Sequence, residues 1–160
     1  MNKQSNVNFD FPEITDRKFA EYLQLFYAKI TRNPYYKYLQ AETHLHLQCC
    51  QYLRWKYPDV LFHHSQNENK RSNFERWLVV LLGMKAGCPD LLIFKQKTVY
   101  LKDETTEVIS GLAVELKVGK NKITDLQKDF LDRLYDNYWE KTVIYSIDEF
   151  MSYIDNYLKN

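Results

Sequence analysis

The sequence lacks several features that would place the protein in a specialised structural class. Only three of its 160 residues are cysteines, Cys49, Cys50 and Cys88. Because their number is odd, two are adjacent and no CxxC pair occurs, they argue against a disulfide framework and a zinc ribbon. The sequence has no internal repeat, low-complexity tract or linker, and about 160 residues usually form one domain. We therefore expect a single main domain.

Long hydrophobic runs are also missing. The longest apolar stretch, residues 77–84, is much shorter than the roughly 18 residues that span a bilayer. The polar N-terminus has no signal-peptide core, so we expect a soluble, intracellular protein without a membrane partner. The net charge is only +1, which neither indicates nor excludes a nucleic-acid partner. Any basic surface must be local.

Apolar residues recur with helical or strand spacing along most of the chain, and the pattern predicts an α/β fold with a small mixed sheet flanked by helices. A first amphipathic helix begins at Thr15 or Asp16 and stops at Asn33-Pro34. The further predicted helices cover residues 41–56, 74–85, 125–138 and 148–158. The predicted strands cover residues 60–63, 91–94, 98–101, 112–117 and 142–146, with 103–110 as a charged excursion.

Helical spacing also predicts which side chains are buried. In the third helix we expect mostly buried positions at Trp77, Leu78, Leu81 and Leu82. In the helix that Thr124 caps, we expect the side chains that face the core to be Leu126, Phe130, Leu131 and Leu134. The aromatic stripe of the first helix fits packing against the domain or a dimer contact. We place residues 1–34, an arm and helix, apart from the main domain, residues 35–160.

Two predicted strands each carry a carboxylate where charge is unexpected. Asp90 precedes the apolar run 91–94, and Glu115 ends the run that begins at Leu112. Lys117 shares the face of Glu115 because alternate residues of a strand point the same way. Buried charges are costly unless they are paired or bind an ion. The pattern favours a Mg²⁺ site that catalyses phosphodiester hydrolysis. A buried ion cluster without catalysis is the alternative interpretation.

The proposed chemistry follows from what Mg²⁺ requires. This ion prefers oxygen ligands and usually takes one or two carboxylates, which Asp90 and Glu115 supply. The backbone carbonyl of Leu116 is placed for a further ligand. Lys117 would orient the attacking water or the scissile phosphate. Glu42, in the first turn of the second helix, is either a further metal ligand or a charge that favours the positive end of that helix.

The tripeptide Glu-x-Lys occurs twice, and the second copy, Glu68-Asn69-Lys70, follows Pro58-Asp59. This copy lies in a polar loop that holds no side chain in a fixed position, whereas Glu115 ends a predicted buried strand. A metal site needs rigid placement of its ligands. We therefore assign the site to Glu115 and treat Glu68 as a decoy.

The four histidines form no convincing metal site. His44 and His46 lie two residues apart, and residues at that spacing do not share a helix face. His63-His64 follow after the second helix. We expect histidines that face solvent or line a groove, and zinc binding remains a weak alternative.

Pro89-Asp90 followed by Glu115-Leu116-Lys117 resembles the signature of the PD-(D/E)XK nuclease superfamily. More narrowly, the segments 87–91, 114–117 and 126–127 resemble the VRR-NUC branch, whose stand-alone members are often encoded by phages and other viruses. The likeness covers about residues 40–158. It implies a restriction-endonuclease-like core in αβαβββαβα order. Two departures are Cys88, where a larger apolar residue is usual, and an unusually long hairpin at 101–110.

The resemblance also implies residue roles. Asp90 and Glu115 match the metal-binding carboxylates of the family, and Lys117 matches its catalytic lysine. Glu42 matches an acidic residue that often completes the metal site, and Gln127 matches a glutamine that steadies the substrate or the attacking water. Mn²⁺ is expected to replace Mg²⁺, and no small-molecule cofactor is expected.

Basic residues flank these motifs and are candidates for sequence-independent contacts with DNA phosphates. They are Lys85, Lys120, Lys122, Lys128 and Arg71. The resemblance implies a homodimeric, Mg²⁺-dependent DNA endonuclease that cuts branched DNA such as Holliday junctions. Two alternatives remain: a nuclease with another substrate, such as a restriction-like, flap or RNA nuclease, and a nucleic-acid-binding module without catalysis.

Overall fold

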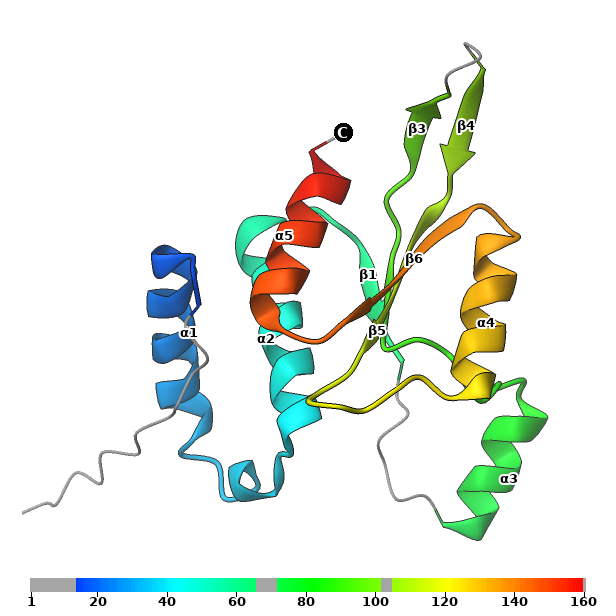
Figure 1. Cartoon of the computed structure of the whole chain (residues 1–160). Coiled ribbons are helices and arrows are strands. Elements are labelled where there is room, and N and C mark those ends of the chain that lie inside the picture. The colour runs from blue at the N-terminus through cyan, green and yellow to red at the C-terminus, as the bar shows by residue number, and fades with distance from the viewer. Residues whose placement is uncertain (1–13, 66–71, 102–104, 160) are drawn as a thin grey trace, which may run out of the picture. The chain divides into compact units, whose positions relative to one another are not determined.

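The computed structural model describes residues 14–65, 72–101 and 105–159 (Figure 1). The chain divides into two compact units, Met1–Lys37 and Tyr38–Asn160. Helix α1 (Arg17–Ile30) lies in the first unit. The Asp16 side chain caps it by accepting hydrogen bonds from the backbone N–H groups of Lys18 and Phe19 at 3.0 and 3.1 Å. The predicted start of this helix at Thr15 or Asp16 is thus confirmed. A short 3-10 helix, η1 (Tyr36–Tyr38), follows.

The second unit is built on a four-stranded mixed sheet. Its spatial order is β1 (Phe62–His64), β2 (Leu91–Ile93), β5 (Gly111–Leu116) and β6 (Trp139–Ile144). The β1/β2 and β2/β5 pairs are antiparallel, whereas β5 and β6 run parallel. All six residues of β5 are buried, as its central position and apolar sequence require. The predicted α/β class with a small mixed sheet is confirmed.

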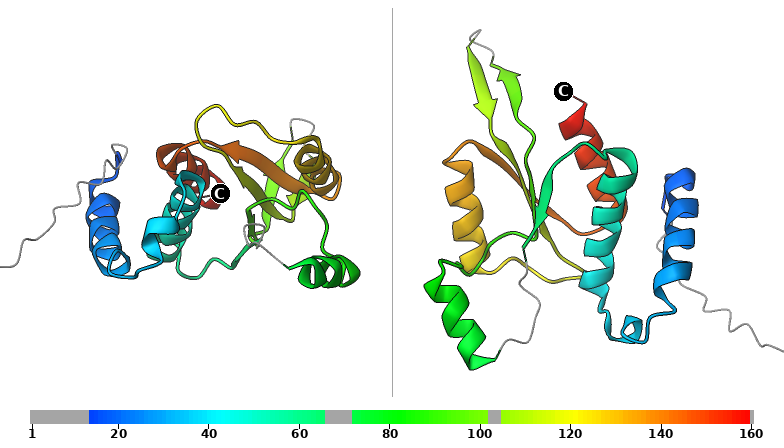
Figure 2. Two further views of the ribbon diagram at one scale, coloured as in Figure 1. Left: turned by 90° about the horizontal axis from the view of Figure 1, so that it is seen from below. Right: turned by 180° about the vertical axis from the view of Figure 1, so that it is seen from behind.

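Helices cover both faces of this sheet. Helices α2 (Ala41–Lys56) and α5 (Ile147–Leu158) lie on one side, and α4 (Asp125–Tyr135) lies on the other (Figures 1 and 2). Fully buried side chains of the first pair include Cys49, Leu53, Phe150 and Ile154. The core therefore fills the space between the sheet and the α2/α5 pair.

A polar cluster joins α2 to α5 near the chain's end. The hydroxyls of Tyr52 and Tyr57 donate hydrogen bonds to Asp155 at 2.7 and 2.6 Å, and the Lys56 ammonium donates at 2.6 Å. Despite partial burial, these three donors hold the pKa of Asp155 below its ordinary value. The cluster fixes how α2, which carries Glu42, is oriented in the unit.

The segment 103–110 differs from its prediction. Residues Thr106–Ile109 form strand β4, which pairs antiparallel with β3 (Lys97–Tyr100) in a separate two-stranded sheet. Exposed and half-buried positions alternate along both strands. We expected only a charged excursion here because its charges hide this alternation. One more strand than expected thus lies between α3 and α4.

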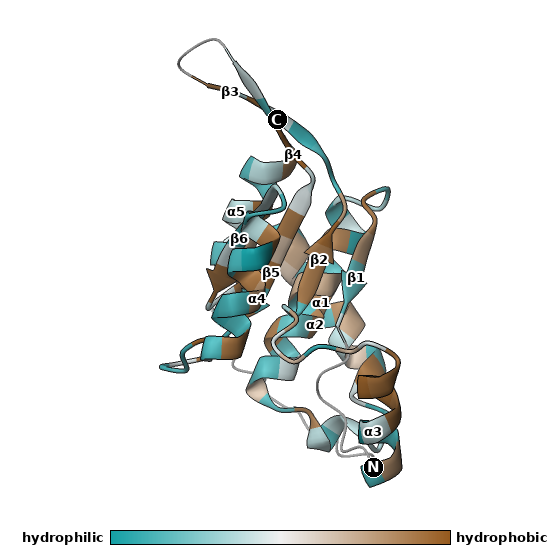
Figure 3. Ribbon diagram, turned by 90° about the vertical axis from the view of Figure 1, so that its right-hand side faces the viewer, coloured by the Kyte–Doolittle hydropathy of each residue, from teal (hydrophilic) through white to brown (hydrophobic). Residues whose placement is uncertain are grey.

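The predicted burial of the third helix is wrong. Helix α3 (Asn73–Leu81) is shorter than the predicted range 74–85, and Trp77, Leu81 and Leu82 are 59%, 64% and 76% exposed. In Figure 3 the hydrophobic residues of α3 are coloured brown. Apolar spacing identifies a one-sided helix, but it does not tell what covers that side.

In α4 the prediction holds only in part. Leu131 is buried, Phe130 and Leu134 are half-buried, and Leu126 is 60% exposed. In the first turn of this helix, the inward position belongs to Gln127 instead. Among the described residues, no helix has both the length and the apolar character needed to cross a membrane.

Candidate active site

The two predicted carboxylates lie at neighbouring strand ends. Strands β2 and β5 pair antiparallel with Leu91 opposite Val114, so Asp90 precedes β2 where β5 reaches Glu115. Both side chains are buried, with exposures of 8% for Asp90 and 1% for Glu115. The Leu116 backbone N–H donates a hydrogen bond to Asp90 Oδ2 at 2.8 Å, which ties the Asp90 carboxylate to β5.

Glu115 and Lys117 form a buried ion pair on one face of β5. The Lys117 ammonium donates a hydrogen bond to Glu115 Oε1 at 2.6 Å. The second carboxylate oxygen, Glu115 Oε2, is buried and has no hydrogen-bond partner within the described part of the chain. Such an oxygen is costly to bury, which makes it a candidate ligand atom.

The electrostatics of this pair are set by crowded negative charge. Burial and then the charge of Asp90 raise the pKa of Glu115 to about 7, although Lys117 opposes the rise. Burial works to lower the pKa of Lys117, but its hydrogen bond and ion pair with Glu115 outweigh burial and raise it above its ordinary value. The lysine is therefore charged at neutral pH. The ammonium of Lys117 thus supplies one positive charge to the site, and the carboxylates can still balance the charge of a second cation.

Gln127 reaches the same cluster from α4. Its side-chain amide nitrogen donates a short hydrogen bond to Glu115 Oε1. Its amide oxygen accepts from the backbone N–H of Thr124 at 2.9 Å, while the Thr124 hydroxyl accepts from the Gln127 backbone N–H at 3.3 Å. This reciprocal capping box fixes which end of the amide faces Glu115. The pattern Thr-x-x-Gln at 124–127 was the available sequence signal for it.

At Gly87 the loop before Asp90 packs directly against the backbone at the start of α4. Its φ of +85° lies in the left-handed region that favours glycine. A Cβ atom on Gly87 would lie 2.3 Å from the backbone oxygen of Leu126 and 2.9 Å from the backbone nitrogen of Gln127. Only a glycine lets these two backbones approach so closely. The sequence prediction did not identify this role.

Glu42 faces the cluster from the first turn of α2. Its Oε1 lies 4.0 Å from the Lys117 ammonium, and its side chain is 39% exposed. Its charge contributes to the raised pKa of Glu115. Across residues 14–65, 72–101 and 105–159, no three Cys, His, Asp or Glu side chains gather tightly enough to hold a metal ion by themselves. Glu42 thus lies beside the buried pair.

The donor set nevertheless fits Mg²⁺. This ion takes oxygen ligands, needs only one or two carboxylates and keeps several waters. Asp90 and Glu115 supply carboxylates, one with the buried unpartnered oxygen. In an extended strand the N–H and C=O of a residue point to the same edge. Because the Leu116 N–H donates to Asp90, the Leu116 carbonyl faces that edge too.

Four of the five predicted basic residues are described, and they lie close in sequence to the elements that carry the cluster. Lys85 precedes β2, Lys120 and Lys122 follow β5, and Lys128 lies in the first turns of α4; all four are exposed. Arg71 and the decoy residues Glu68 and Lys70 fall outside the described residues. The assignment of Glu115 over Glu68 therefore rests on the buried geometry of Glu115 alone.

His46 and His64 pack against each other, a contact that their positions in the sequence did not predict. The rings of His46 in α2 and His64 in β1 meet edge to face with their centroids 4.3 Å apart. His46 is buried, on the stripe of Leu45, Cys49 and Leu53. The spacing of His46 from Cys49 and Leu53 was the signal for burial.

Known proteins share both a sequence pattern and a fold with this chain. The pattern of the VRR-NUC domain matches residues 31–147. A solved structure described as a VRR_NUC domain protein has the same fold, with a TM-score of 0.58, 24% sequence identity, and coverage of 76% of this chain and 90% of that chain. A search of curated proteins finds no match. Because the domain pattern covers most of the sequence, the chain belongs to the VRR-NUC domain family, whose members are generally nucleases.

Proposed function

We propose that this protein is a Mg²⁺-dependent DNA endonuclease that hydrolyses phosphodiester bonds at the Asp90/Glu115 cluster. The observation that carries the proposal is the pair of buried carboxylates at adjacent strand ends, one of which has a buried oxygen without a partner. Burial and the charge of Asp90 raise the pKa of Glu115, and a bound cation would offset this cost of the ionised carboxylate. Membership of a generally nucleolytic family gives the reaction class.

The proposed metal ligands are Asp90, Glu115 and the Leu116 carbonyl, with Glu42, whose carboxylate lies 4.0 Å from the Lys117 ammonium, as a further ligand. When bound, Mg²⁺ would stabilise negative charge on the phosphate and lower the pKa of a water molecule bound to it. Mn²⁺ is expected to substitute, since carboxylate and carbonyl oxygens suit both ions. No small-molecule cofactor is required.

The roles of the other residues follow from their contacts. Lys117 is charged and buried, so it is suited to hold a phosphate oxygen or the attacking water close to Glu115. Gln127 keeps Glu115 Oε1 occupied, which leaves Oε2 as the oxygen that faces the ligand. Thr124 orients the Gln127 amide through the capping box.

DNA is the proposed partner, and the exposed lysines provide its non-specific anchoring. Lys85, Lys120, Lys122 and Lys128 follow or precede the elements that carry the carboxylates and Gln127. Ammonium groups in such positions bind backbone phosphates without reading sequence. Arg71 is proposed for the same role from the sequence alone.

We further propose a homodimer that acts on branched DNA. Symmetric cleavage of two strands needs two active sites, which a two-fold dimer provides. The exposed apolar surface of α3 and the residues just after it, formed by Phe74, Trp77, Val80, Leu81 and Leu82, supports self-association. Large apolar side chains that are exposed together on one short helix favour an interaction surface. No membrane partner is proposed.

The test is cleavage of a matched substrate panel by the purified protein with Mg²⁺ or Mn²⁺. The panel contains single-stranded DNA, linear duplex, a flap, a four-way junction and RNA of related sequence. We expect the junction to be cut fastest and metal chelation to abolish cleavage. Equal rates on linear and branched DNA would reject structure selectivity. Faster cleavage of RNA than of any DNA would reject the substrate class.

A further inference from the structure

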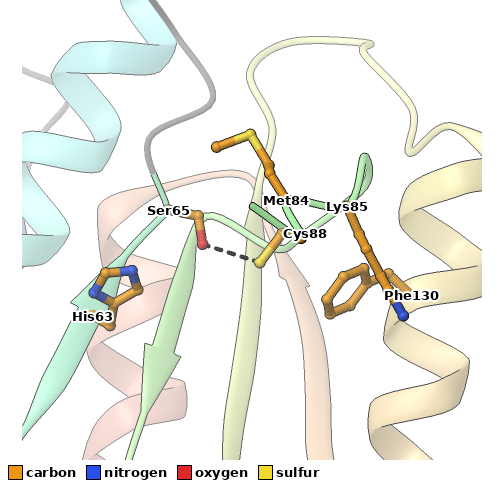
Figure 4. Close-up of a pocket in the computed structure, with 7 residues that line it drawn as sticks. His63, Ser65, Met84, Lys85, Cys88 and Phe130 are labelled. Carbon is orange, nitrogen blue, oxygen red and sulfur yellow. Dashed lines mark hydrogen bonds between the residues drawn. The ribbon is translucent and has the colours of Figure 1, made fainter. Parts of the chain in front are cut away.

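A cavity of about 310 Å³ lies between the end of β1, the loop before β2 and α4. It is lined by His63, Ser65, Gly83, Met84, Lys85, Cys88 and Phe130 (Figure 4). The volume is at the lower end of the range of small-molecule sites, so it suits a flat group of one or two rings. None of the proposed catalytic residues or metal ligands lines it.

The walls of this cavity are attached to the catalytic cluster on two sides. The Ser65 backbone N–H donates a hydrogen bond to the Asp90 backbone oxygen at 3.0 Å, and Cys88 lies two residues before Asp90. Phe130 lies one helical turn after Gln127, whose amide contacts Glu115. The cavity is therefore built on the same loop and helix that carry Asp90 and Gln127.

The lining combines the groups that a nucleobase needs. The Phe130 ring and the Met84 thioether offer apolar surfaces for stacking. Ser65 Oγ and Cys88 Sγ share a hydrogen bond 3.2 Å long. A hydroxyl both donates and accepts, so Ser65, together with the His63 ring, can still offer a hydrogen bond to a base edge. Lys85 is exposed at the cavity and is suited to the phosphate of the same nucleotide.

We propose that this cavity receives one unpaired nucleobase of the DNA, from a nucleotide beside the scissile phosphate. This inference rests on the proposed function and names the class of substrate that the site prefers. A paired base is held inside the duplex and cannot enter the cavity, whereas a base that is already unpaired enters without the cost of unpairing. The cavity thus selects DNA with unpaired nucleotides, as at bulges, and it accepts a four-way junction once a base pair at the branch point opens.

Cleavage of three matched duplexes tests the preference. One is perfectly paired, one has a single-nucleotide bulge, and one has the same bulge without its base. We expect the unvaried protein to cut the bulged duplex about tenfold faster than the other two. Phe130→Leu keeps an apolar side chain but removes the stacking ring, so the preference should fall to about twofold or less. Phe130→Tyr should retain it.

The matched control is Tyr135→Leu, which removes an exposed aromatic ring from the same helix outside the cavity. It should leave the tenfold preference intact. Equal cleavage of the three duplexes by the unvaried protein, or an unchanged preference in Phe130→Leu, would overturn the proposal. Cleavage itself would stand in both cases, so this failure is distinct from failure of the proposed function.

A binding measurement decides the proposal even if no duplex is cut. Asp90→Asn is titrated with a bulged duplex that carries 2-aminopurine as the unpaired base, and fluorescence is recorded. Stacking on Phe130 should quench the fluorescence, and the double variant with Phe130→Leu should lose most of the quenching. The same quenching in both proteins, or none in either, would contradict the proposal.

Discussion

At the scale of single residues, the buried carboxylate of Glu115 carries an electrostatic cost that the folded protein offsets only in part. Its carboxylate is 1% exposed, lies near Asp90, and has one oxygen without a partner among the described residues. The ammonium of Lys117 offsets only part of this cost, because the pKa of Glu115 stays raised, at about 7. A divalent cation would relieve the rest.

Magnesium should therefore stabilise the folded protein. At a Mg²⁺ concentration ten times its Kd, the stabilisation is about 1.4 kcal/mol, which differential scanning calorimetry detects as a higher Tm. Glu115→Gln and Asp90→Asn should lose this response. Asp129→Asn, which changes an exposed carboxylate of α4, should keep it. A Mg²⁺ response that persists in Glu115→Gln would place the metal elsewhere.

His46 should make stability depend on pH. Burial, followed by the charge of His64, lowers the pKa of His46 to about 4. The unfolded chain takes up this proton near pH 6.5, whereas the folded chain does not until pH 4. Between these values protonation favours the unfolded chain, so stability falls as the pH drops. At about 1.4 kcal/mol per pH unit, the loss reaches roughly 3 kcal/mol.

Urea unfolding at pH 7.5 and pH 4.5 measures this effect. The difference in unfolding free energy should shrink by roughly 2 kcal/mol in His46→Gln. The exposed His63 is the matched control, and His63→Gln should behave as the unvaried protein. If His46→Gln keeps the full pH dependence, the acid sensitivity comes from other groups.

At the scale of helices and strands, the sequence predicted most of what positions the site. The helix predicted at 41–56 is α2 with the same bounds, and Thr124 caps α4 as expected. Both predictions succeeded because caps and proline stops are local signals. The burial of α3 could not be predicted, since Trp77 and Leu81 give the same pattern on a core helix and on an exposed one.

The sequence also predicted which residues come together at the site. The strand-end placement of Asp90 and Glu115 and the approach of Glu42 and Gln127 follow from the motif spacing and the resemblance. The close contact at Gly87 could not be read from the chain, because it depends on two backbones that are distant in sequence. The roles of these residues stay predictions until activity is measured.

Gly87 should be far less tolerant of substitution than Gly83. Both have positive φ, and alanine costs about 1–2 kcal/mol in that region. The Cβ of Gly83→Ala would meet nothing within 4 Å, whereas that of Gly87→Ala would displace the Leu126 backbone at the start of α4. We expect Gly87→Ala to lose at least about 2 kcal/mol more than Gly83→Ala in urea unfolding. Equal losses would mean that the two backbones are not in contact.

At the scale of the whole molecule, the apolar surface of α3 is the feature that the isolated chain does not explain. Trp77 is 59% exposed and lies beside other exposed apolar side chains. A self-complementary two-fold contact would bury this surface in both copies. We expect the protein to sediment as a dimer.

Trp77→Lys should convert the dimer to a monomer, because a buried charge in an apolar interface is costly. Trp77→Phe keeps the apolar character and should preserve the dimer. Analytical ultracentrifugation with circular dichroism separates dissociation from unfolding. A monomeric unvaried protein, or a dimeric Trp77→Lys, would show that α3 does not mediate self-association.

The central claim is that Asp90 and Glu115 form a metal-dependent nuclease site, and the most direct test is the single-turnover rate of DNA cleavage in Mg²⁺. Asp90→Asn keeps the size of the side chain but removes the charge that holds the metal. We predict that Asp90→Asn cleaves DNA at least about a hundredfold more slowly than the unvaried protein, and that neither protein cleaves after metal chelation. Cleavage by Asp90→Asn at the rate of the unvaried protein would contradict the assignment.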